Sequence, residues 1–294
     1  MKYFLLSALL CAGAFTSEAQ LKLPALSPTA KINQEFSTSS IDITYSRPSM
    51  RGRKIFCDGC VVPFGKVWRT GANSATKIKL GEDMEIAGQR IKAGEYALYT
   101  IPGKERWEVI LNDGVGNWGV DGYSRDHDIA RFSVKPTAID GDCQTFTIMI
   151  TDITYNTCKI EMVWERTRIV LPVVSRNSEA IEKNIDKAIN HPSIPYFQVA
   201  SYYYESDKNL DQAATYVNKA LEGAPDAYYM WYLKARIEKR RGNNSEAIMA
   251  AKKSIETAQG SAFEAEYIRN NNKIIDEINK SKRHRQDADD MSKF

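Results

Sequence analysis

The chain has 294 residues, which is enough for two domains of ordinary size, and its 43% hydrophobic content allows each of them to bury a core. Its 40 basic and 37 acidic residues give a formal net charge of +3 and are interspersed, so no long basic face indicates nucleic-acid binding. Beyond the N-terminus no stretch is apolar over the length that a transmembrane helix needs, so no transmembrane segment is expected.

The first residues, 1–19, have the parts of a secretory signal peptide. Lys2 supplies a positive charge, and an apolar stretch too short to anchor the chain follows it. Ser17 and Ala19 are small residues at the positions that precede a cleavage site. We therefore expect export to the periplasm or the cell exterior, where the protein could lie peripheral to the outer membrane. Lipidation of Cys11 is an alternative, but the residue before it is bulkier than a lipobox accepts.

Four of the five cysteines remain after the expected cleavage, an even number that permits disulfides in an oxidising compartment. Cys57 and Cys60 form a C-x-x-C motif that lacks the βαβ setting of a thioredoxin-like site and the second ligand pair of a zinc site. We therefore predict a local disulfide between them, and no metal site. Residues 145–151 and 159–171 are expected to form one hairpin, with Cys143 at the far end of its strand and Cys158 beside the turn, so the two are too far apart to pair.

Two-residue alternation dominates residues 25–172. Ile41, Ile43 and Tyr45, for example, point to one side of their segment while polar residues point to the other. The pattern predicts about eight to ten short antiparallel strands in an all-β domain of the sandwich or barrel-like kind. The expected strands are 40–46, 75–80, a hairpin over 84–91, 95–102, 106–112, 129–135, 145–151 and 159–171.

Two loops rich in basic residues interrupt this pattern, and they supply the candidate ligand-binding residues. Their guanidinium, ammonium, hydroxyl and amide groups would donate hydrogen bonds to a small anionic or saccharide ligand, and an indole would stack on a sugar ring. A structural role is the alternative, in which the arginines bond buried backbone carbonyls and the tryptophan belongs to the core. The candidates are Arg47, Lys66, Trp68, Arg69, Thr70 and Asn73.

The same loops and strands carry a family resemblance. The runs are YSRP at 45–48, RGRKIF at 51–56, VPFGKVWRTGAN at 62–73, KAGEYALYTIP at 92–102 and WEVILN at 107–112. In this order they resemble the bacterial family called domain of unknown function 2911, over residues 25–172. The family's name marks what the resemblance implies: a β-rich exported domain and no established reaction. The segment that holds the C-x-x-C motif departs from the family pattern.

Two other motifs are weaker. Residues 114–119 match G-x-G-x-x-G, but no helical pattern follows and no βαβ unit surrounds them, so no dinucleotide or other cofactor is predicted. Asp126, His127 and Asp128 are adjacent in sequence, and adjacent side chains rarely converge on one ion. A solvated loop is the expectation there.

Residues 175–281 change to a helical period. Phe197 and Ala213 have counterparts in Trp231 and Ala247, and both offsets are 34 residues, the period of a tetratricopeptide repeat. The small residues would let paired antiparallel helices approach closely. A final helix over 262–281 would cap the array, and residues 282–294 are expected to form a disordered tail.

The sequence therefore predicts an antiparallel β domain followed by a tetratricopeptide-like helical array. We expect a non-enzymatic module of the periplasm or cell envelope that binds a ligand through the β-domain loops and another protein or peptide through the repeats. One alternative is a hydrolase or lyase that acts on envelope saccharides through Arg47, Lys66, Arg69 and Asn73. Another is an assembly factor in which both parts only scaffold.

Overall fold

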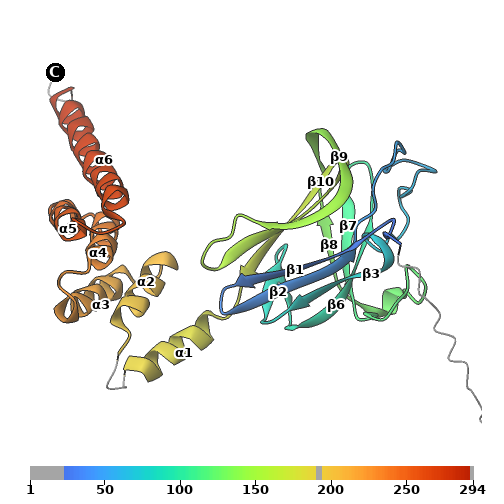
Figure 1. Ribbon diagram of the computed structural model, residues 1–294, viewed down its shortest axis with the longest axis horizontal. Coiled ribbons are helices and arrows are strands. Elements are labelled where there is room, and N and C mark those ends of the chain that lie inside the picture. The colour runs from blue at the N-terminus through green and yellow to red at the C-terminus, as the bar shows by residue number, and fades with distance from the viewer. Residues whose placement is uncertain (1–22, 190–193, 292–294) are drawn as a thin grey trace, which may run out of the picture.

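The computed structural model describes residues 23–189 and 194–291. A β-rich N-terminal part is followed by a helical part, and the two are joined through the first helix (Figure 1). This confirms the predicted fold class of antiparallel sheets followed by helices. The expected signal peptide, its cleavage site and Cys11 lie outside the described residues. Within the described residues, no helix combines the length and the apolar character needed to cross a membrane.

Two antiparallel sheets make up the β part. The first has six strands in the order β1-β2-β3-β6-β7-β8, and the second has four in the order β5-β4-β10-β9. The strands of the first sheet are β1 (Thr29–Phe36), β2 (Ser39–Ser46), β3 (Ala72–Leu80), β6 (Gly94–Ile101), β7 (Trp107–Asn112) and β8 (Asp128–Val134). Those of the second are β4 (Met84–Ile86), β5 (Gln89–Ile91), β9 (Thr137–Thr151) and β10 (Thr157–Ser175).

The core lies between the two sheets and follows the predicted alternation. Ile41, Ile43 and Tyr45 of β2 are all buried, and they belong to one apolar cluster with residues of β9 and β10. The Tyr45 ring meets Phe146 edge to face at a centroid distance of 5.7 Å, and its hydroxyl accepts a hydrogen bond of 2.9 Å from the Ile148 amide. The phenol thus packs as an apolar body while its polar end is satisfied across the sheets.

The strands differ from the sequence prediction at three places. The sequence analysis did not foresee β1, and β9 begins at Thr137 rather than at residue 145. β10 runs on to Ser175. The first half of β9 is exposed on both faces, so it carries no alternation to detect. Its partner strand is irregular at Glu165, where the register shifts and φ is +53°.

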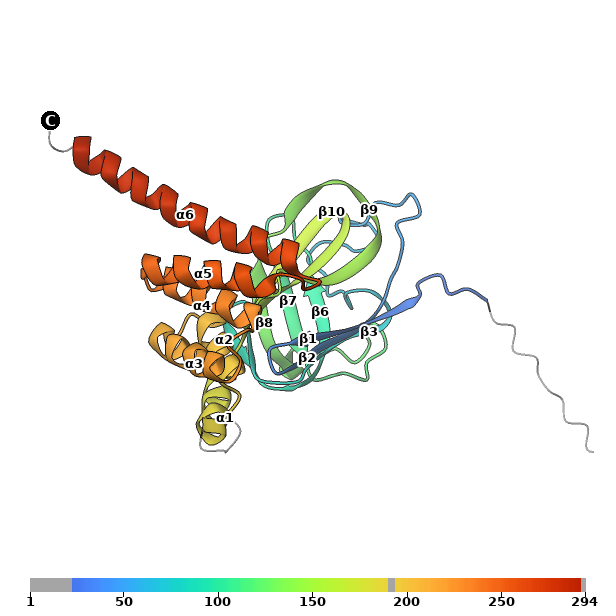
Figure 2. The same cartoon turned by 60° about the vertical axis from the view of Figure 1, so that its left-hand side comes forward.

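The helical part has six helices in the described residues, packed largely as antiparallel neighbours (Figure 2). α2 packs on α3, α4 packs on α5, and α6 packs on both α4 and α5. Ala213 and Ala247 are fully buried at these contacts. The helices are α1 (Ser178–Ile189), α2 (Tyr196–Glu205), α3 (Leu210–Gly223), α4 (Tyr228–Arg240), α5 (Asn244–Ala258) and α6 (Glu264–Met291).

The turn between α4 and α5 is held by a buried carboxylate. Glu238 is 4% exposed and accepts hydrogen bonds of 2.9 Å from Arg241 and 2.7 Å from the Asn243 amide. An apolar or aromatic residue is usual at this position of a tetratricopeptide unit. The charge is tolerated here because every donor it needs is supplied by the turn itself.

The last helix extends beyond its predicted end. α6 continues to Met291, whereas the sequence analysis ended it at residue 281 and expected a disordered tail. The added segment contains Lys, Arg, Gln, Ala and Asp but neither Gly nor Pro, so nothing in it breaks a helix.

The start of the helical part is bonded to turns of the β part. The Ser175 hydroxyl donates to Glu82 at 2.7 Å, and the Asn177 amide donates to the same carboxylate at 2.6 Å. Tyr155, in the turn between β9 and β10, packs on Tyr202 of α2 with ring centroids 5.5 Å apart. The helices therefore contact the β part through side chains as well as through the connecting chain.

Candidate functional site

Trp68 does not present a stacking face to a ligand. The side chain is 7% exposed and lies in the core, where it stacks on Trp164 at 5.7 Å and meets Phe146 at 5.0 Å. Its indole N–H donates to the Gly71 carbonyl at 3.0 Å. The structural alternative describes this residue correctly, because its indole is part of the aromatic core of the β part.

Thr70 and Arg47 are also used inside the protein. Thr70 is fully buried and its hydroxyl lies 3.2 Å from that of Thr100. Arg47 donates from Nε to the Phe146 carbonyl at 3.1 Å and from its terminal nitrogen to Thr147 at 2.7 Å. Since Arg47 follows β2 and its acceptors lie on β9, the guanidinium ties the two sheets together.

The remaining candidates are spread over different surroundings. Asn73 is exposed, has a φ of +60° and donates to the Ser46 hydroxyl at 3.2 Å. Lys66 is exposed to solvent. Arg69 lies beside Gly119, and its Nε is buried without a hydrogen-bond partner among the described residues. The structure therefore does not gather the six predicted residues into one ligand pocket: two are buried, and two are engaged with the protein's own atoms.

The cysteines adopt two different states. Cys57 and Cys60 are joined by a disulfide, with Cα atoms 5.1 Å apart, and it closes a loop on the surface. Cys143 and Cys158 are free thiols on neighbouring strands of the second sheet. Burial raises the pKa of the Cys158 thiol to about 12, so the thiol stays protonated at neutral pH.

The acidic and glycine-rich motifs that the sequence analysis weighed lie in the loop between β7 and β8. The His127 imidazole pairs with Asp113 at 2.9 Å, whereas Asp128 faces Arg131 at 2.7 Å. Across the described part of the chain, no group of three potential ligands converges on a metal position. The glycine-rich run leads into a single 3-10 turn at Arg125–His127 and not into an α-helix, so no helix N-terminus faces a pyrophosphate.

A polar network that the sequence analysis missed secures this loop. Asn112, fully buried, donates to Asp128 at 2.9 Å, and Arg131 donates to the Tyr123 hydroxyl at 2.6 Å and to Glu108. Burial, followed by the nearby Asp128 charge, raises the pKa of Tyr123. The residues of this network come from β7, β8 and the loop between them, and the pairing of the two strands brings them together, so no sequence spacing could reveal the network. The network is internally satisfied and positions the loop.

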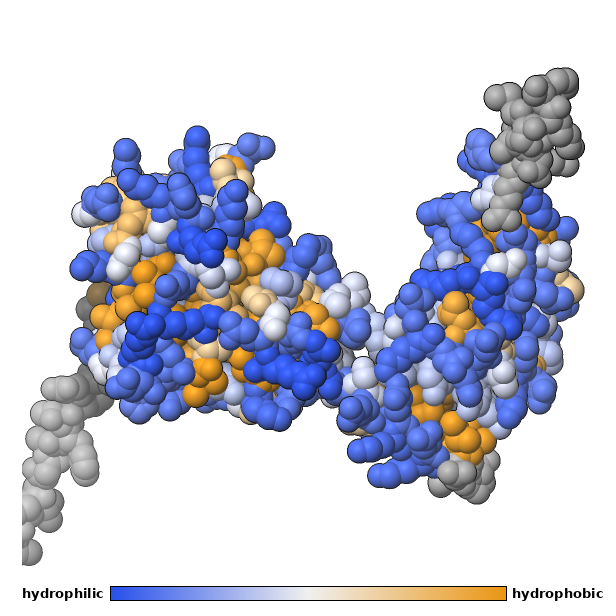
Figure 3. Space-filling model, turned by 180° about the vertical axis from the view of Figure 1, so that it is seen from behind, coloured by the Kyte–Doolittle hydropathy of each residue, from blue (hydrophilic) through white to orange (hydrophobic). Residues whose placement is uncertain are grey.

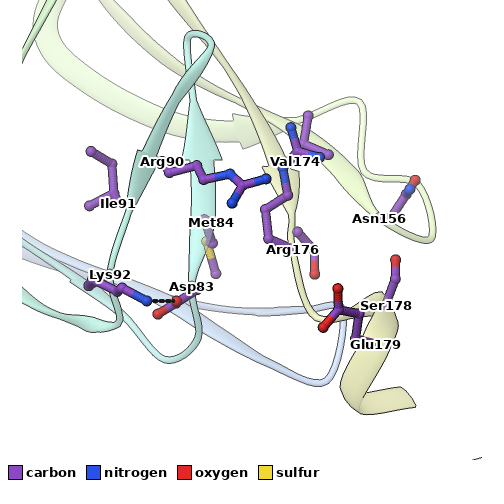
Figure 4. A pocket seen from close by; sticks show the side chains of 11 residues that line it. Asp83, Met84, Arg90, Ile91, Lys92, Asn156, Val174, Arg176, Ser178 and Glu179 are labelled. Atoms are coloured by element: carbon purple, nitrogen blue, oxygen red, sulfur yellow. Dashed lines mark hydrogen bonds and ion pairs between the residues drawn. The ribbon is translucent and has the colours of Figure 1, made fainter. Parts of the chain in front are cut away.

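A cleft of about 400 Å³ lies where the β part meets the first helix (Figure 4). Side chains from the β4–β5 hairpin, the end of β10 and the start of α1 line it. Three cations and two carboxylates face it, and two of the cations are neutralised locally. Lys92 bonds Asp83 at 2.7 Å, which lowers the pKa of that carboxyl, and Arg176 pairs with Glu85. The lining residues are Asp83, Met84, Arg90, Ile91, Lys92, Asn156, Val174, Ser175, Arg176, Ser178 and Glu179.

A second groove, of about 380 Å³, lies on the helical part between α2, α4 and α6. Four cations and one carboxylate line it together with two tyrosines. Hydrophilic residues also cover most of the helical part when it is seen from behind (Figure 3). The lining residues are Tyr204, Tyr232, Arg236, Lys239, Arg240, Asn270, Lys273, Ile274 and Glu277.

The arginines of this groove are held in place by aromatic rings. The Tyr204 ring lies 4.5 Å from the guanidinium of Arg236 and 4.4 Å from that of Arg240. Lys239 pairs with Glu277 across α4 and α6 and lowers the pKa of that carboxyl. A guanidinium stacked on an aromatic ring still has the N–H donors of its own plane to offer to an acidic ligand.

The comparisons with known proteins address only the β part. The model of a family described as "Protein of unknown function (DUF2911)" matches residues 27–173. No curated protein and no solved structure matches the chain. The family match ends in the last strand of the second sheet, before the first helix begins.

Proposed function

The chain belongs to the DUF2911 family of proteins of unknown function, and from this premise we propose that it is an exported, non-enzymatic binding protein whose helical part holds a partner polypeptide. The groove between α2, α4 and α6 is the observation that carries the proposal. The partner segment that fits it is acidic.

The spacing and burial of the helices support the proposal of a tetratricopeptide-like array. α3 and α5 begin at Leu210 and Asn244, which are 34 positions apart and so have the same spacing as the repeated Ala213 and Ala247. Both alanines are fully buried between paired helices. In such arrays the first helix of each pair lines a continuous surface that binds extended or helical peptides. α2, α4 and α6 supply that surface here.

The charge of the groove favours an acidic segment. Arg236 and Arg240 are paired at its edge with Glu205 and Asp207, at 3.1 and 3.2 Å, and these acidic partners are partly exposed. Exposed pairs of this kind contribute little stability, so an incoming carboxylate can replace them. Lys273 adds a further positive charge on α6. Tyr204 and Tyr232 offer apolar surface between the charges.

The disulfide supports export. Bonds of this kind persist in oxidising compartments such as the periplasm and are rare in the cytosol. The one between Cys57 and Cys60 closes a short loop on the surface. The amino-terminal signal expected from the sequence leads to the same compartment.

The alternative of an enzyme acting on envelope saccharides finds less support. Its proposed cluster places Arg47 on backbone and hydroxyl acceptors between the sheets, and Asn73 on a neighbouring hydroxyl. No carboxylate or imidazole is bonded to this cluster among the described hydrogen bonds of Arg47, Arg69 and Asn73. A general base within reach is what a hydrolase would need there.

The test uses a fluorescein-labelled peptide rich in Asp and Glu and a matched peptide with Asn and Gln at the same positions. Fluorescence anisotropy with the full chain should show salt-sensitive binding of the acidic peptide and little binding of the neutral one. The double variant Arg236→Gln, Lys273→Gln should weaken binding about tenfold or more.

A double variant Lys183→Gln, Lys252→Gln is the matched control, because it removes the same charge from exposed positions on α1 and α5. Its affinity should equal that of the wild type. Equal affinity for both peptides, or equal losses in the two double variants, would show that only net charge matters and would refute the groove as the binding site. Circular dichroism should show the same helix content in every protein.

A further inference from the structure

Trp118 is an exposed indole on a fixed loop. It is 65% exposed, whereas the three other tryptophans of the β part are at most 7% exposed. The loop forms a bridge between Trp118 and Ser74 of β3, and the Ala75 amide donates to the Asn117 carbonyl at 3.3 Å. The Asn117 side chain donates to the Tyr99 hydroxyl at 3.1 Å. An indole held on an anchored backbone offers a flat apolar face to a ligand at little cost in conformational entropy.

A polar groove is lined by Ser74, the β3 residue whose backbone pairs with that of Trp118. It has a volume of about 370 Å³ and runs over the outer face of β1, β2 and β3. Lys31, Thr44 and Lys77 are consecutive partners across the three strands, so two ammonium groups flank one hydroxyl on the same face.

We propose that Trp118 and this groove bind a saccharide chain that carries acidic groups, such as uronic acids. A pyranose ring presents a face of C–H groups that packs on an indole, while its hydroxyls need donors and acceptors at its edge. Thr44 and Ser74 supply hydroxyls, and Lys31 and Lys77 supply charge for the carboxylates. The site is independent of the helical groove proposed for a polypeptide.

The geometry assigns this role to Trp118 in place of Trp68, the tryptophan that the sequence favoured. Neighbouring strands lie about 4.8 Å apart, so Lys31 and Lys77 stand about 10 Å apart on either side of β2. That distance exceeds the length of one sugar residue, so a ligand that reaches both lysines must be an oligosaccharide. Glu95 also lines the groove, so the two lysines and this one carboxylate give it a net charge of +1.

The experiment titrates the full chain by calorimetry with oligomers of galacturonate, mannuronate, guluronate and glucuronate. For each acid, the methyl ester of the same oligomer serves as the neutral match. At least one acid should bind, and its ester should bind more weakly. Trp118→Ala should lower that affinity about tenfold, while Trp118→Phe should retain most of it. Lys31→Gln with Lys77→Gln should abolish the preference for the acid over the ester.

Phe263→Ala is the matched control, since Phe263 is a 53% exposed aromatic residue on the helical part. It should leave binding unchanged. The proposal is overturned if none of the four acids binds, if Trp118→Ala binds as tightly as the wild type, or if Phe263→Ala causes the same loss. If the acidic peptide does not bind but the saccharide titrations give the expected results, the saccharide site still stands. The two proposals can therefore fail separately.

Discussion

Replacing Ala213 by leucine tests whether the paired helices are packed as tightly as a repeat requires. Ala213 is fully buried on α3 and belongs to the same apolar cluster as Val199 and Ala200 of α2 and Leu233 of α4. A leucine adds three carbon atoms where no space is left, so the helices must separate or the side chain must take a strained rotamer. We expect the helical part to lose about 1–3 kcal/mol of unfolding free energy.

This loss translates into a temperature that can be measured. For a part of this size, each kcal/mol lowers the midpoint by about 4 °C, so the helical transition should fall by about 4–12 °C. Thermal unfolding followed by far-UV circular dichroism at 222 nm reports chiefly on the helices, and a single cooperative transition there gives their midpoint. Because neighbouring repeats share interfaces, the loss should spread to α4 and α5.

Ala265→Leu is the matched control for this prediction, because Ala265 is exposed in the first turn of α6. Its effect should stay within about 0.5 kcal/mol. The β part has a separate core, so its strand signal should persist in both variants. An unchanged helical midpoint in Ala213→Leu would refute the close packing of α2 on α3 and, with it, the repeat assignment.

Three further predictions concern single groups. In the native protein a thiol reagent at pH 8 should modify Cys143 faster than Cys158, whose raised pKa of about 12 and burial keep it neutral and shielded; mass spectrometry of the labelled peptides measures this, and equal rates would contradict it. Glu238→Ala should cost the helical part about 1.5–3 kcal/mol in urea unfolding, because it removes the carboxylate that holds the α4–α5 turn; a change below 0.5 kcal/mol would show that the turn closes without it. Lys239 lowers the pKa of Glu277 below its ordinary value of 4.5, so the pair stabilises the fold at pH values above 4.5, and this contribution should be lost as the pH falls through the lowered pKa; Lys239→Gln should remove that dependence, and an unaltered acid midpoint would argue against the pair.

The loop candidates show where sequence reasoning was limited. An arginine, a tryptophan and a threonine in a glycine-rich loop fit both a ligand pocket and a core plug, because both need donors and apolar surface. Only the path of the loop between β2 and β3 decides which. That path places Trp68 among the aromatic residues of the core and turns Arg47 towards β9. Trp118, next to glycines and unremarkable in sequence, is the indole that reaches solvent.

Local patterns determined much of this protein without any tertiary information. The two-residue period of β2 and the 34-residue spacing of the helical alanines depend only on the geometry of strands and helices, so both could be read directly from the sequence. So could the pairing of Cys57 with Cys60, since three residues of chain already bring them close. Tertiary structure alone decided which polar groups meet: Lys31 with Lys77 across β2, Asn112 with Asp128, and the cations of α4 with α6. Such meetings depend on strand order and helix packing, which bring together residues far apart in sequence and leave no spacing by which to predict them.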